Sequence, residues 1–326
     1  MNDVITVCIC VYNAGSFLQE TLDSLEKQSY QKFEYLIIDD GSTDNSVEVI
    51  KQFEKHSSRE VNTIFIEKNK GTAYCRNLAI NTVKTELMMF FDSDDIAKPN
   101  LLECLFSRIN QDYKCIAVSC YSDYIDINGN YLKCGQHIGP VSQSEFMDKA
   151  SQGKLIFMLP ITLFKKEFAL KAGGYRTKGF PENSNIRYQD LSEDLDMWSR
   201  ISDFYNEGYY MITIPEALFM YRKSRQSLST GEDKQFAMQL KMRYIKTNLK
   251  LRRDNKAEIS FIEFIDKMSK REYKSQVRTF KSGYHYRNAA FSFVDKCYFK
   301  AFLGMCLAFF YSPKYMLNKI KSISKI

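Results

Sequence analysis

The sequence is poor in several features that mark other classes of protein. Its 326 residues include three histidines, one tryptophan and six prolines, and its nine cysteines form no CxxC pair. An odd set of thiols without a framework favours a reducing compartment over a disulfide-linked secreted fold. The N-terminus lacks a charged region followed by an apolar stretch, so we expect no signal peptide.

Glycine-rich phosphate loops and long apolar runs are also missing. The segment 10–15 holds one glycine and no lysine or arginine. A dehydrogenase with a GxGxxG loop is therefore excluded, and a sugar-nucleotide nucleotidyltransferase with a basic triphosphate loop is disfavoured. The apolar run 301–311 has 11 residues, whereas a membrane-spanning helix needs about 20.

Apolar runs and helix-like segments alternate through the first half of the chain. This alternation predicts βαβ units and an α/β fold with a mostly parallel central sheet. Ser16 and Asp44 are expected to cap the first two helices. The expected strands cover 5–11, 35–38, 63–66, 87–91 and 115–119, and the expected helices cover 16–28, 44–54, 73–84 and 100–110.

The alternation weakens after about residue 131. Residues 126–130 predict a hairpin turn, 194–205 a helix and 209–214 a strand. From about 233 the chain is helical and basic, so a domain boundary is expected near 230. Residues 1–234 hold 26 Lys+Arg and 33 Asp+Glu, whereas 235–326 hold 20 and 6. This basic extension is expected to face an anionic partner, either phospholipid or nucleic acid.

Two acidic clusters follow apolar runs. Asp39-Asp40-Gly41-Ser42 follows one, and Asp92-Ser93-Asp94-Asp95 follows another. Either cluster alone is compatible with a helix cap. Because ligands bind outside the carboxyl ends of the strands in open α/β sheets, we expect both clusters to face one crevice. Carboxylates two positions apart can hold Mg²⁺ or Mn²⁺ and leave positions open for diphosphate oxygens.

Together with four further motifs, these clusters resemble family 2 glycosyltransferases of the GT-A fold. The resemblance covers residues 4 to about 230 and not the extension. It implies a catalytic domain over 1–230, with a nucleotide-binding half, 1–125, and an acceptor-binding half, 126–230. The motifs are Val11-Tyr12-Asn13, Asp39 to Asp44, Asn69-Lys70-Gly71 with Arg76-Asn77, Asp92 to Asp95, Ser192-Glu193-Asp194, and Tyr221-Arg222 through Ser227 and Ser229.

The resemblance implies a UDP-sugar donor and a divalent metal, Mn²⁺ or Mg²⁺. Asp40 would accept the N3–H of uracil, and Asp94 with Asp92 would hold the metal. Arg76 would lie near the nucleotide, although a surface salt bridge is the default for an arginine. The nucleotide-sugar site would consist of Cys10, Val11, Asn13, Asp40, Arg76, Asp92 and Ser93.

An inverting transferase needs a general base for the acceptor hydroxyl. None of the three histidines lies in a motif, so we expect a carboxylate base. By resemblance the second acid of Glu193-Asp194 is that base, and the alternative is a capped helix start. The residues expected to position the acceptor or a loop are Asp95, Glu193, Trp198 and Arg200.

Two departures from the family pattern affect this interpretation. Ser224 stands where the family often has a histidine, which leaves any metal or diphosphate contact of that histidine open. The processive members' Gln-x-x-Arg-Trp motif is absent, which favours transfer of a single sugar. A catalytically inactive, transferase-like scaffold is the non-enzymatic alternative, and the intact Asp40, Asp94 and Asp194 argue against it.

The extension 231–326 carries aromatic residues beside lysines. Lys296, Lys300 and Lys314 flank the apolar run, and no acid follows Asp295. This composition suits docking on an anionic membrane, and packing on the catalytic domain is the alternative. Nucleic acid is not expected, because no nucleic-acid motif is present. We therefore expect a cytoplasmic enzyme on the inner membrane face, acting on a glycan or polyprenyl-diphosphate-linked acceptor in O-antigen or capsule synthesis.

Overall fold

The computed structural model describes residues 3–181, 185–223, 231–294 and 296–323. The motif serines Ser224, Ser227 and Ser229 lie outside the described residues. The chain divides into two compact units. Unit 1 comprises residues 1–228 and 241–258, and unit 2 comprises 229–240 and 259–326.

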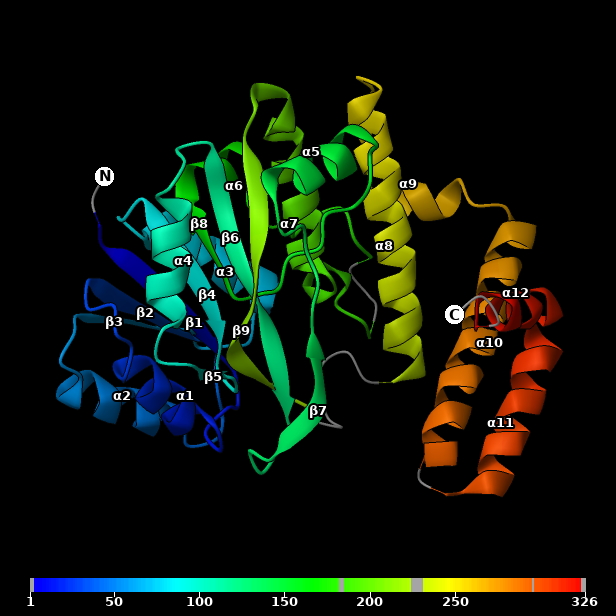
Figure 1. Cartoon of the computed structure of the whole chain (residues 1–326), viewed down its shortest axis with the longest axis horizontal. Helices are drawn as coiled ribbons and strands as arrows, with labels where there is room; N and C mark the ends of the chain where they lie inside the picture. Colours follow the sequence, from blue (N-terminus) through cyan, green and yellow to red (C-terminus); the bar gives the residue numbers. More distant parts are fainter. Residues whose placement is uncertain (1–2, 182–184, 224–230, 295, 324–326) are drawn as a thin grey trace. The chain divides into compact units, whose positions relative to one another are not determined.

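The described residues of unit 1 form a nine-stranded sheet with the order β3-β2-β1-β4-β8-β6-β9-β5, and β7 pairs with β6 (Figure 1). The strands β3, β2, β1 and β4 are parallel, β8 is antiparallel to its neighbours, and β6 and β9 are again parallel. The expected α/β fold with a mostly parallel sheet is confirmed. The strands are β1 (Ile5–Val11), β2 (Phe33–Asp39), β3 (Val61–Phe65), β4 (Leu87–Asp92), β5 (Ile96–Ala97), β6 (Cys115–Ile125), β7 (Tyr131–Gln136), β8 (Thr162–Lys165) and β9 (Tyr210–Arg222).

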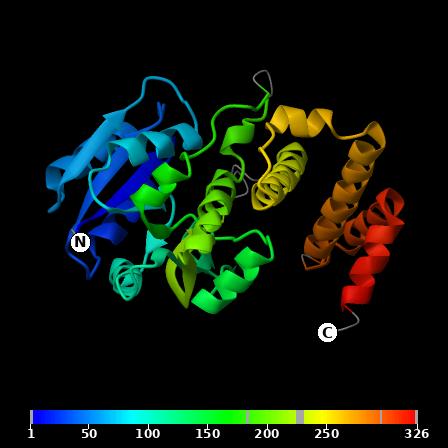
Figure 2. The same ribbon diagram turned by 90° about the horizontal axis from the view of Figure 1, so that it is seen from above.

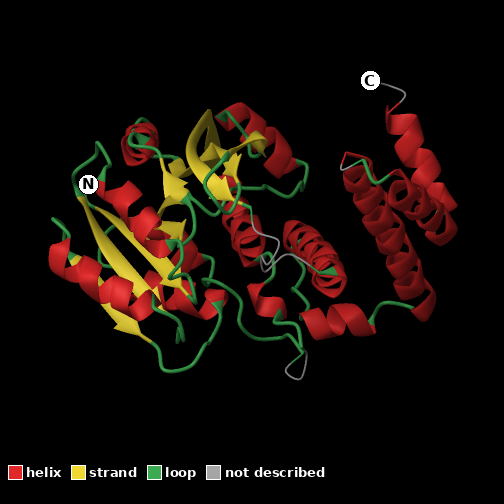
Figure 3. Ribbon diagram, turned by 90° about the horizontal axis from the view of Figure 1, so that it is seen from below, coloured by secondary structure: helices red, strands yellow, loops and turns green. Residues whose placement is uncertain are grey.

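Helices pack on both faces of this sheet (Figures 2 and 3). On one side α1 contacts α2, and on the other α6 contacts both α3 and α7. The helices of unit 1 are α1 (Leu18–Glu26), α2 (Ser46–His56), α3 (Thr72–Thr82), α4 (Leu101–Ile109), α5 (Gln143–Ser151), α6 (Lys166–Lys171), η1 (Tyr188–Asp190), α7 (Glu193–Ile201), η2 (Ser202–Glu207) and the second half of α8 (Glu232–Arg253).

Burial explains why the central strands read as continuous apolar runs. Nearly every residue of β1 and β4 is buried, because strands inside a parallel sheet are covered on both faces. The edge strand β3 instead carries half-buried and exposed residues. The apolar core therefore lies along β1 and its neighbours, and it fixes the positions of the loops at their carboxyl ends.

The structure corrects several predicted boundaries. Phe17 and Asn45, rather than Ser16 and Asp44, precede α1 and α2, and neither caps its helix with a side-chain hydrogen bond. Asp44 Oδ1 nevertheless accepts the amide of Ser46 at 3.0 Å. The strand predicted over 209–214 continues to Arg222, because β9 follows β6 through register shifts near Tyr121. The hairpin turn after Ile125 is present, with Gly129 at φ 82°.

Unit 2 is helical. It contains the first turns of α8, then α9 (Phe261–Asp266), α10 (Lys270–Val294), α11 (Tyr298–Tyr311) and α12 (Pro313–Ile323). Within this unit α10 and α11 lie side by side (Figure 1). Residues 241–258, which lie beyond the boundary expected near 230, belong to unit 1. No helix in the described ranges has the length and apolar character needed to cross a bilayer.

Candidate active site

Strand register brings the two acidic clusters to the same edge of the sheet. Cys10 of β1 pairs with Ile38 of β2 on one side and with Asp92 of β4 on the other. Val11 pairs with Asp39. Neighbouring strands lie about 4.8 Å apart, so the two clusters flank the end of β1 within about 10 Å of each other.

The loops after β1 and β2 are joined by Asn13. Its backbone adopts φ 50°, and its amide donates to Ser42 Oγ at 2.9 Å. Its side-chain Oδ1 accepts the backbone amide of Thr43 at 2.8 Å. Asn13 therefore holds the two loops together at the predicted base pocket.

Asp40 is buried and accepts two backbone amides at the start of α3. Its Oδ1 accepts the amide of Lys70 at 2.7 Å, and its Oδ2 accepts that of Gly71 at 2.8 Å. Two amides at a helix N-terminus stabilise a carboxylate. Each carboxylate oxygen keeps a further lone pair, so Asp40 can still accept one donor from a ligand.

Arg76 of α3 links the two halves of unit 1. It is 5% exposed, and its Nη1 donates to Glu193 Oε1 at 2.9 Å. Its Nη2 lies 3.5 Å from Asp92 Oδ1. Burial raises the pKa of Glu193 to about 7, and the nearby Arg76 opposes that shift. Arg76 is thus a buried cation between two acids rather than a surface salt bridge.

The loop after β4 places Asp94 and Asp95 in different environments. Asp95 is 1% exposed, and its Oδ1 accepts the amide of Arg222 at 2.9 Å. Burial raises the pKa of Asp94 from its ordinary value near 3.8 to about 6, and the charge of Asp92 adds to this effect. Among the ion pairs of the described residues, none involves Asp94. Asp95 therefore anchors the loop, whereas Asp94 forms no ion pair with another described residue.

Arg222, at the end of β9, fixes the geometry of that loop. Its Nε donates to the carbonyl oxygen of Asp94 at 2.8 Å, and its Nη2 pairs with Glu20 Oε2 at 2.5 Å. Its Nη1 donates at 3.3 Å to the carbonyls of Asp126 and Ile127. The sequence indicated Tyr221-Arg222 only as part of a motif, and the positioning role became visible only in the structure.

The carboxylates of Asp92 and Asp94 fit a divalent cation. The charge of Asp92 adds to the raised pKa of Asp94, and Asp92 shares Arg76 with Glu193. No group of three or more His, Cys, Asp or Glu side chains with metal-site geometry occurs in the described ranges. Mg²⁺ commonly takes only one or two carboxylates and completes its shell with phosphate oxygens and water. The residues present therefore suit a metal that arrives with a diphosphate.

Asp194 lies in the first turn of α7, beside Glu193. Ser192 precedes them with φ 50°, an uncommon conformation for a residue other than glycine. Asp194 Oδ1 accepts the amide of Leu195 at 2.7 Å, and its charge acts on Arg76 and on Asp92. The carboxylate predicted as the base thus lies close to the arginine and the end of β4.

A buried lysine that the sequence analysis did not indicate supports the segment before Glu193 and Asp194. Lys241 of α8 is 1% exposed, and its Nζ donates to the carbonyl oxygen of Gln189 at 3.1 Å. Asp190, which follows Gln189 in the chain, accepts the backbone amide of Ala73 at 2.9 Å through its Oδ1. Lys241 therefore supports the segment that leads into Glu193 and Asp194, from a position beyond the predicted domain boundary.

The remaining predicted residues divide between the loop and the core. Ser93 is half-buried in the loop after β4. Trp198 is 2% exposed and packs edge-on against Phe164, with ring centroids 5.5 Å apart. Arg200 is buried, with Nη2 3.0 Å from Asp196 Oδ2. Trp198 and Arg200 thus stabilise α7, and any effect on an acceptor passes through that helix.

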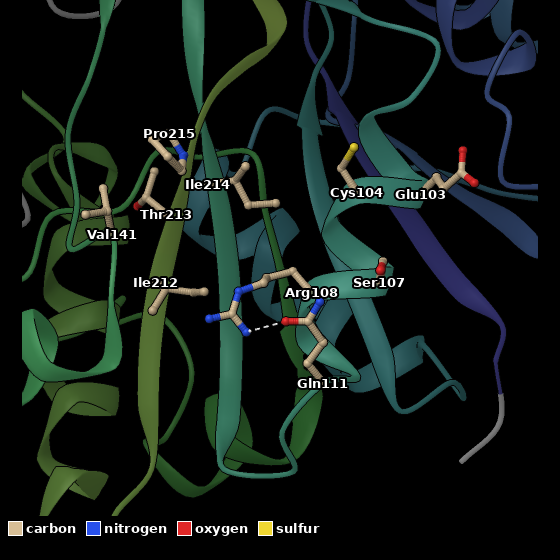
Figure 4. Close-up of a pocket in the computed structure, with 10 residues that line it drawn as sticks. All are labelled: Glu103, Cys104, Ser107, Arg108, Gln111, Val141, Ile212, Thr213, Ile214 and Pro215. Carbon is tan, nitrogen blue, oxygen red and sulfur yellow. Dashed lines mark hydrogen bonds between the residues drawn. The ribbon is translucent and has the colours of Figure 1, made fainter.

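A pocket of about 460 Å³ lies between α4 and β9, away from these acids (Figure 4). Another, of about 490 Å³, is lined by Tyr121, His137 and the segment 155–157. No residue predicted for the nucleotide, metal or base site lines either pocket.

Comparison with solved structures supports the GT-A fold. A 1–349 fragment of S. aureus TarS, solved in complex with UDP-GlcNAc, matches at a TM-score of 0.55 and 15% identity, covering 92% of this chain and 90% of that one. A mannosyltransferase from Pyrobaculum calidifontis, solved with GDP-Man and Mn²⁺, matches at a TM-score of 0.53 and 16% identity, covering 97% and 87%. The expected GT-A architecture is confirmed.

Sequence comparison identifies the family. TuaG of Bacillus subtilis, a putative teichuronic acid biosynthesis glycosyltransferase, is 34% identical over 229 residues, which cover 70% of this chain and 82% of TuaG. The glycosyltransferases GlyG and GlyA of Streptococcus pneumoniae are 34% and 33% identical, and the matched regions span 43% and 32% of their lengths. The model of "Glycosyl transferase family 2" matches residues 6–170. The chain therefore belongs to glycosyl transferase family 2.

Proposed function

We propose that this protein is an inverting, non-processive glycosyltransferase that moves one hexose from a UDP-sugar to a glycan acceptor. The hexose is glucose, galactose or an N-acetylated hexosamine. The observation that carries the proposal is the gathering of Asp194 and Glu193 with Arg76 and the end of β4. This arrangement sets a carboxylate base beside a cation and a pair of acids suited to a metal diphosphate.

In the proposed reaction Asp194 takes the proton of the acceptor hydroxyl. The acceptor oxygen forms a bond to the anomeric carbon, and the bond from that carbon to the diphosphate oxygen breaks. UDP leaves with the electron pair, and the configuration at the anomeric carbon inverts. Arg76 pairs with Glu193 and favours its charged form, so that Asp194 is held at a fixed orientation in the first turn of α7.

Asp94 and Asp92 would hold Mn²⁺ or Mg²⁺ at the donor diphosphate. Such an ion neutralises the charge that develops on the leaving group. The Mn²⁺ complex of the Pyrobaculum calidifontis neighbour supports this assignment, as does the raised pKa of the buried Asp94 carboxyl beside Asp92. Ser93 would lie between the two ligands, and Asp95 would hold the loop through Arg222.

Relatives and neighbours support the choice of donor and acceptor. The TarS fragment binds UDP-GlcNAc, and TuaG is named for teichuronic acid biosynthesis. By analogy we assign a UDP-sugar donor and an acceptor in cell-surface polysaccharide synthesis, with a polyprenyl-diphosphate-linked sugar as the preferred form. Such an acceptor places the enzyme in the cytoplasm, on the inner face of the membrane.

Release of UDP from a panel of UDP-sugars tests this proposal. Purified protein is incubated with UDP-glucose, UDP-galactose, UDP-GlcNAc or UDP-GalNAc in the presence of Mn²⁺, with GDP-mannose as a comparison. We expect slow UDP release from one donor, which EDTA abolishes and a suitable acceptor accelerates. No release from any UDP-sugar, together with no UDP binding, would support an inactive scaffold instead.

A further inference from the structure

Helix α11 presents a continuous apolar stripe to solvent. Phe299, Phe302 and Phe310 are 79%, 69% and 80% exposed, and Leu303 is 50% exposed. At 100° per residue these side chains and the exposed Cys306 fall within an arc of about 100°. We call this set, Phe299, Phe302, Leu303, Cys306 and Phe310, the outer stripe of α11.

The opposite side of α11 packs within unit 2. Ala301 and Ala308 are buried, and Ser282 of α10 donates to the carbonyl oxygen of Ala308 at 2.7 Å. The small residue Gly304 lies against Ala289 of α10. The helix is therefore anchored through its small residues, while its largest apolar side chains face away from α10.

Soluble surfaces seldom carry several neighbouring large apolar side chains without a partner. A spanning role is excluded for α11, since 14 residues extend about 21 Å and the bilayer core is about 30 Å thick. The stripe therefore fits an occupant that covers it from one side, such as a membrane interface or another protein surface.

The charge of the two units distinguishes between a membrane interface and another protein surface as the partner. Unit 2 contains 14 Lys+Arg and 6 Asp+Glu, a net charge of +8, while unit 1 contains 32 and 33, a net charge of −1. Lys300, in the first turn of α11, and Lys314, in the first turn of α12, are exposed. A second copy of unit 2 would bring two strongly positive surfaces together, whereas an anionic bilayer would attract them.

We propose that the outer stripe of α11 inserts into the interface of an anionic membrane, with Lys300 and Lys314 contacting lipid phosphates. This inference extends the proposed function, because a lipid-linked acceptor lies at the same surface. The interaction is peripheral. Burial of the apolar side chains contributes binding free energy that salt does not screen. The lysines contribute electrostatic binding free energy, which salt weakens.

Vesicle sedimentation of the full chain provides the test. We expect binding to vesicles of phosphatidylcholine with about 30% phosphatidylglycerol, and much weaker binding to phosphatidylcholine alone. The variant Phe302→Ser/Phe310→Ser should bind at least about tenfold more weakly, since two large apolar side chains no longer leave water on binding. Lys300→Gln/Lys314→Gln should weaken binding mainly at low salt.

Two controls make the result specific. Ile262→Ser changes an exposed apolar residue of α9 in the same unit, and it should leave vesicle binding within twofold of wild type. A polarity-sensitive fluorophore on Cys306, in a Cys297→Ser background because both thiols are exposed, should shift its emission to the blue on anionic vesicles. Circular dichroism checks that each variant remains folded.

Equal vesicle binding by wild type and the Phe302→Ser/Phe310→Ser variant would overturn the proposal. A wild-type dimer in light scattering that becomes monomeric in this variant, with no vesicle binding by either protein, would assign the stripe to self-association instead. UDP release in solution is measured for the same proteins. It should be unchanged in the stripe variant, so failure of docking and failure of the proposed chemistry are distinguishable.

Discussion

Arg76 and Glu193 form an ion pair of 2.9 Å that joins α3 to α7, although 117 positions separate them in the sequence. The pair ties the proposed nucleotide-binding half to the helix that carries the proposed base. Because both side chains are largely buried, the charge of one depends on the presence of the other.

Removing Arg76 should therefore destabilise the protein and impair transfer. Arg76→Met leaves Glu193 buried without its partner and is expected to cost about 3 kcal/mol of unfolding free energy. Arg76→Met/Glu193→Leu should recover most of that stability without recovering activity. Lys171→Met, in the exposed pair with Glu167, serves as the control and should change stability by less than about 0.5 kcal/mol. Urea unfolding measures these changes. Equal losses of unfolding free energy in Arg76→Met and Lys171→Met would contradict this account.

Asp94→Asn should raise the stability of the protein and at the same time impair its proposed activity. The folded state raises the pKa of Asp94 to about 6, so the folded protein binds this proton more tightly than the unfolded chain does. Stability should then fall as the pH rises from about 4 to 6, and the full penalty applies above that range. Without metal or donor, Asp94→Asn should be more stable than wild type at pH 7.5 by about 1–3 kcal/mol, and similar to it near pH 4.

The same variant should lose metal-dependent UDP binding. Calorimetry with UDP and Mn²⁺ measures this effect, and unchanged affinity in Asp94→Asn would remove the residue from the metal site. Asp123→Asn is a suitable control, because Asp123 also follows an apolar strand segment but pairs with Lys98 at 2.8 Å.

Arg222→Lys tests the anchoring of the loop after β4. Lysine keeps the charge but cannot reproduce donation from Nε to Asp94 and from the two Nη groups to Ile127 and Glu20. We expect a loss of about 2–4 kcal/mol in stability and a fall in kcat, with UDP affinity in the absence of metal little changed. A variant with wild-type kcat would show that the loop holds its shape without this residue.

The layout of the sheet was largely predictable from the sequence, and the supports of the site were not. The apolar run of β1 gave its bounds, because a buried parallel strand is apolar throughout. The acidic clusters also lie where strand ends were expected. Arg222 and Lys241 were missed as supports because their contacts join segments 52 to 202 residues apart, and local patterns carry no signal for such pairs. The end of β9 was missed because Pro215 and the exposed Glu216 interrupt its pattern.

Asp40 should select the nucleotide base. Its carboxylate is fixed by the amides of Lys70 and Gly71, so it presents a fixed acceptor to the N3–H of uracil. Competition by UDP, dTDP, GDP and CDP measures the selectivity, and UDP and dTDP should bind most tightly because thymine presents the same edge. Tightest binding by GDP would contradict the uracil assignment.

The comparison of Asp194→Asn with wild type tests the central claim most directly. Donor binding is measured by calorimetry with UDP and Mn²⁺, and turnover by UDP release from the best donor with its acceptor. The account predicts UDP affinity within about threefold of wild type and turnover reduced by about two or more orders of magnitude, because only the proton acceptor is lost. Turnover near the wild-type rate would contradict the account and leave Asp194 as part of a helix start.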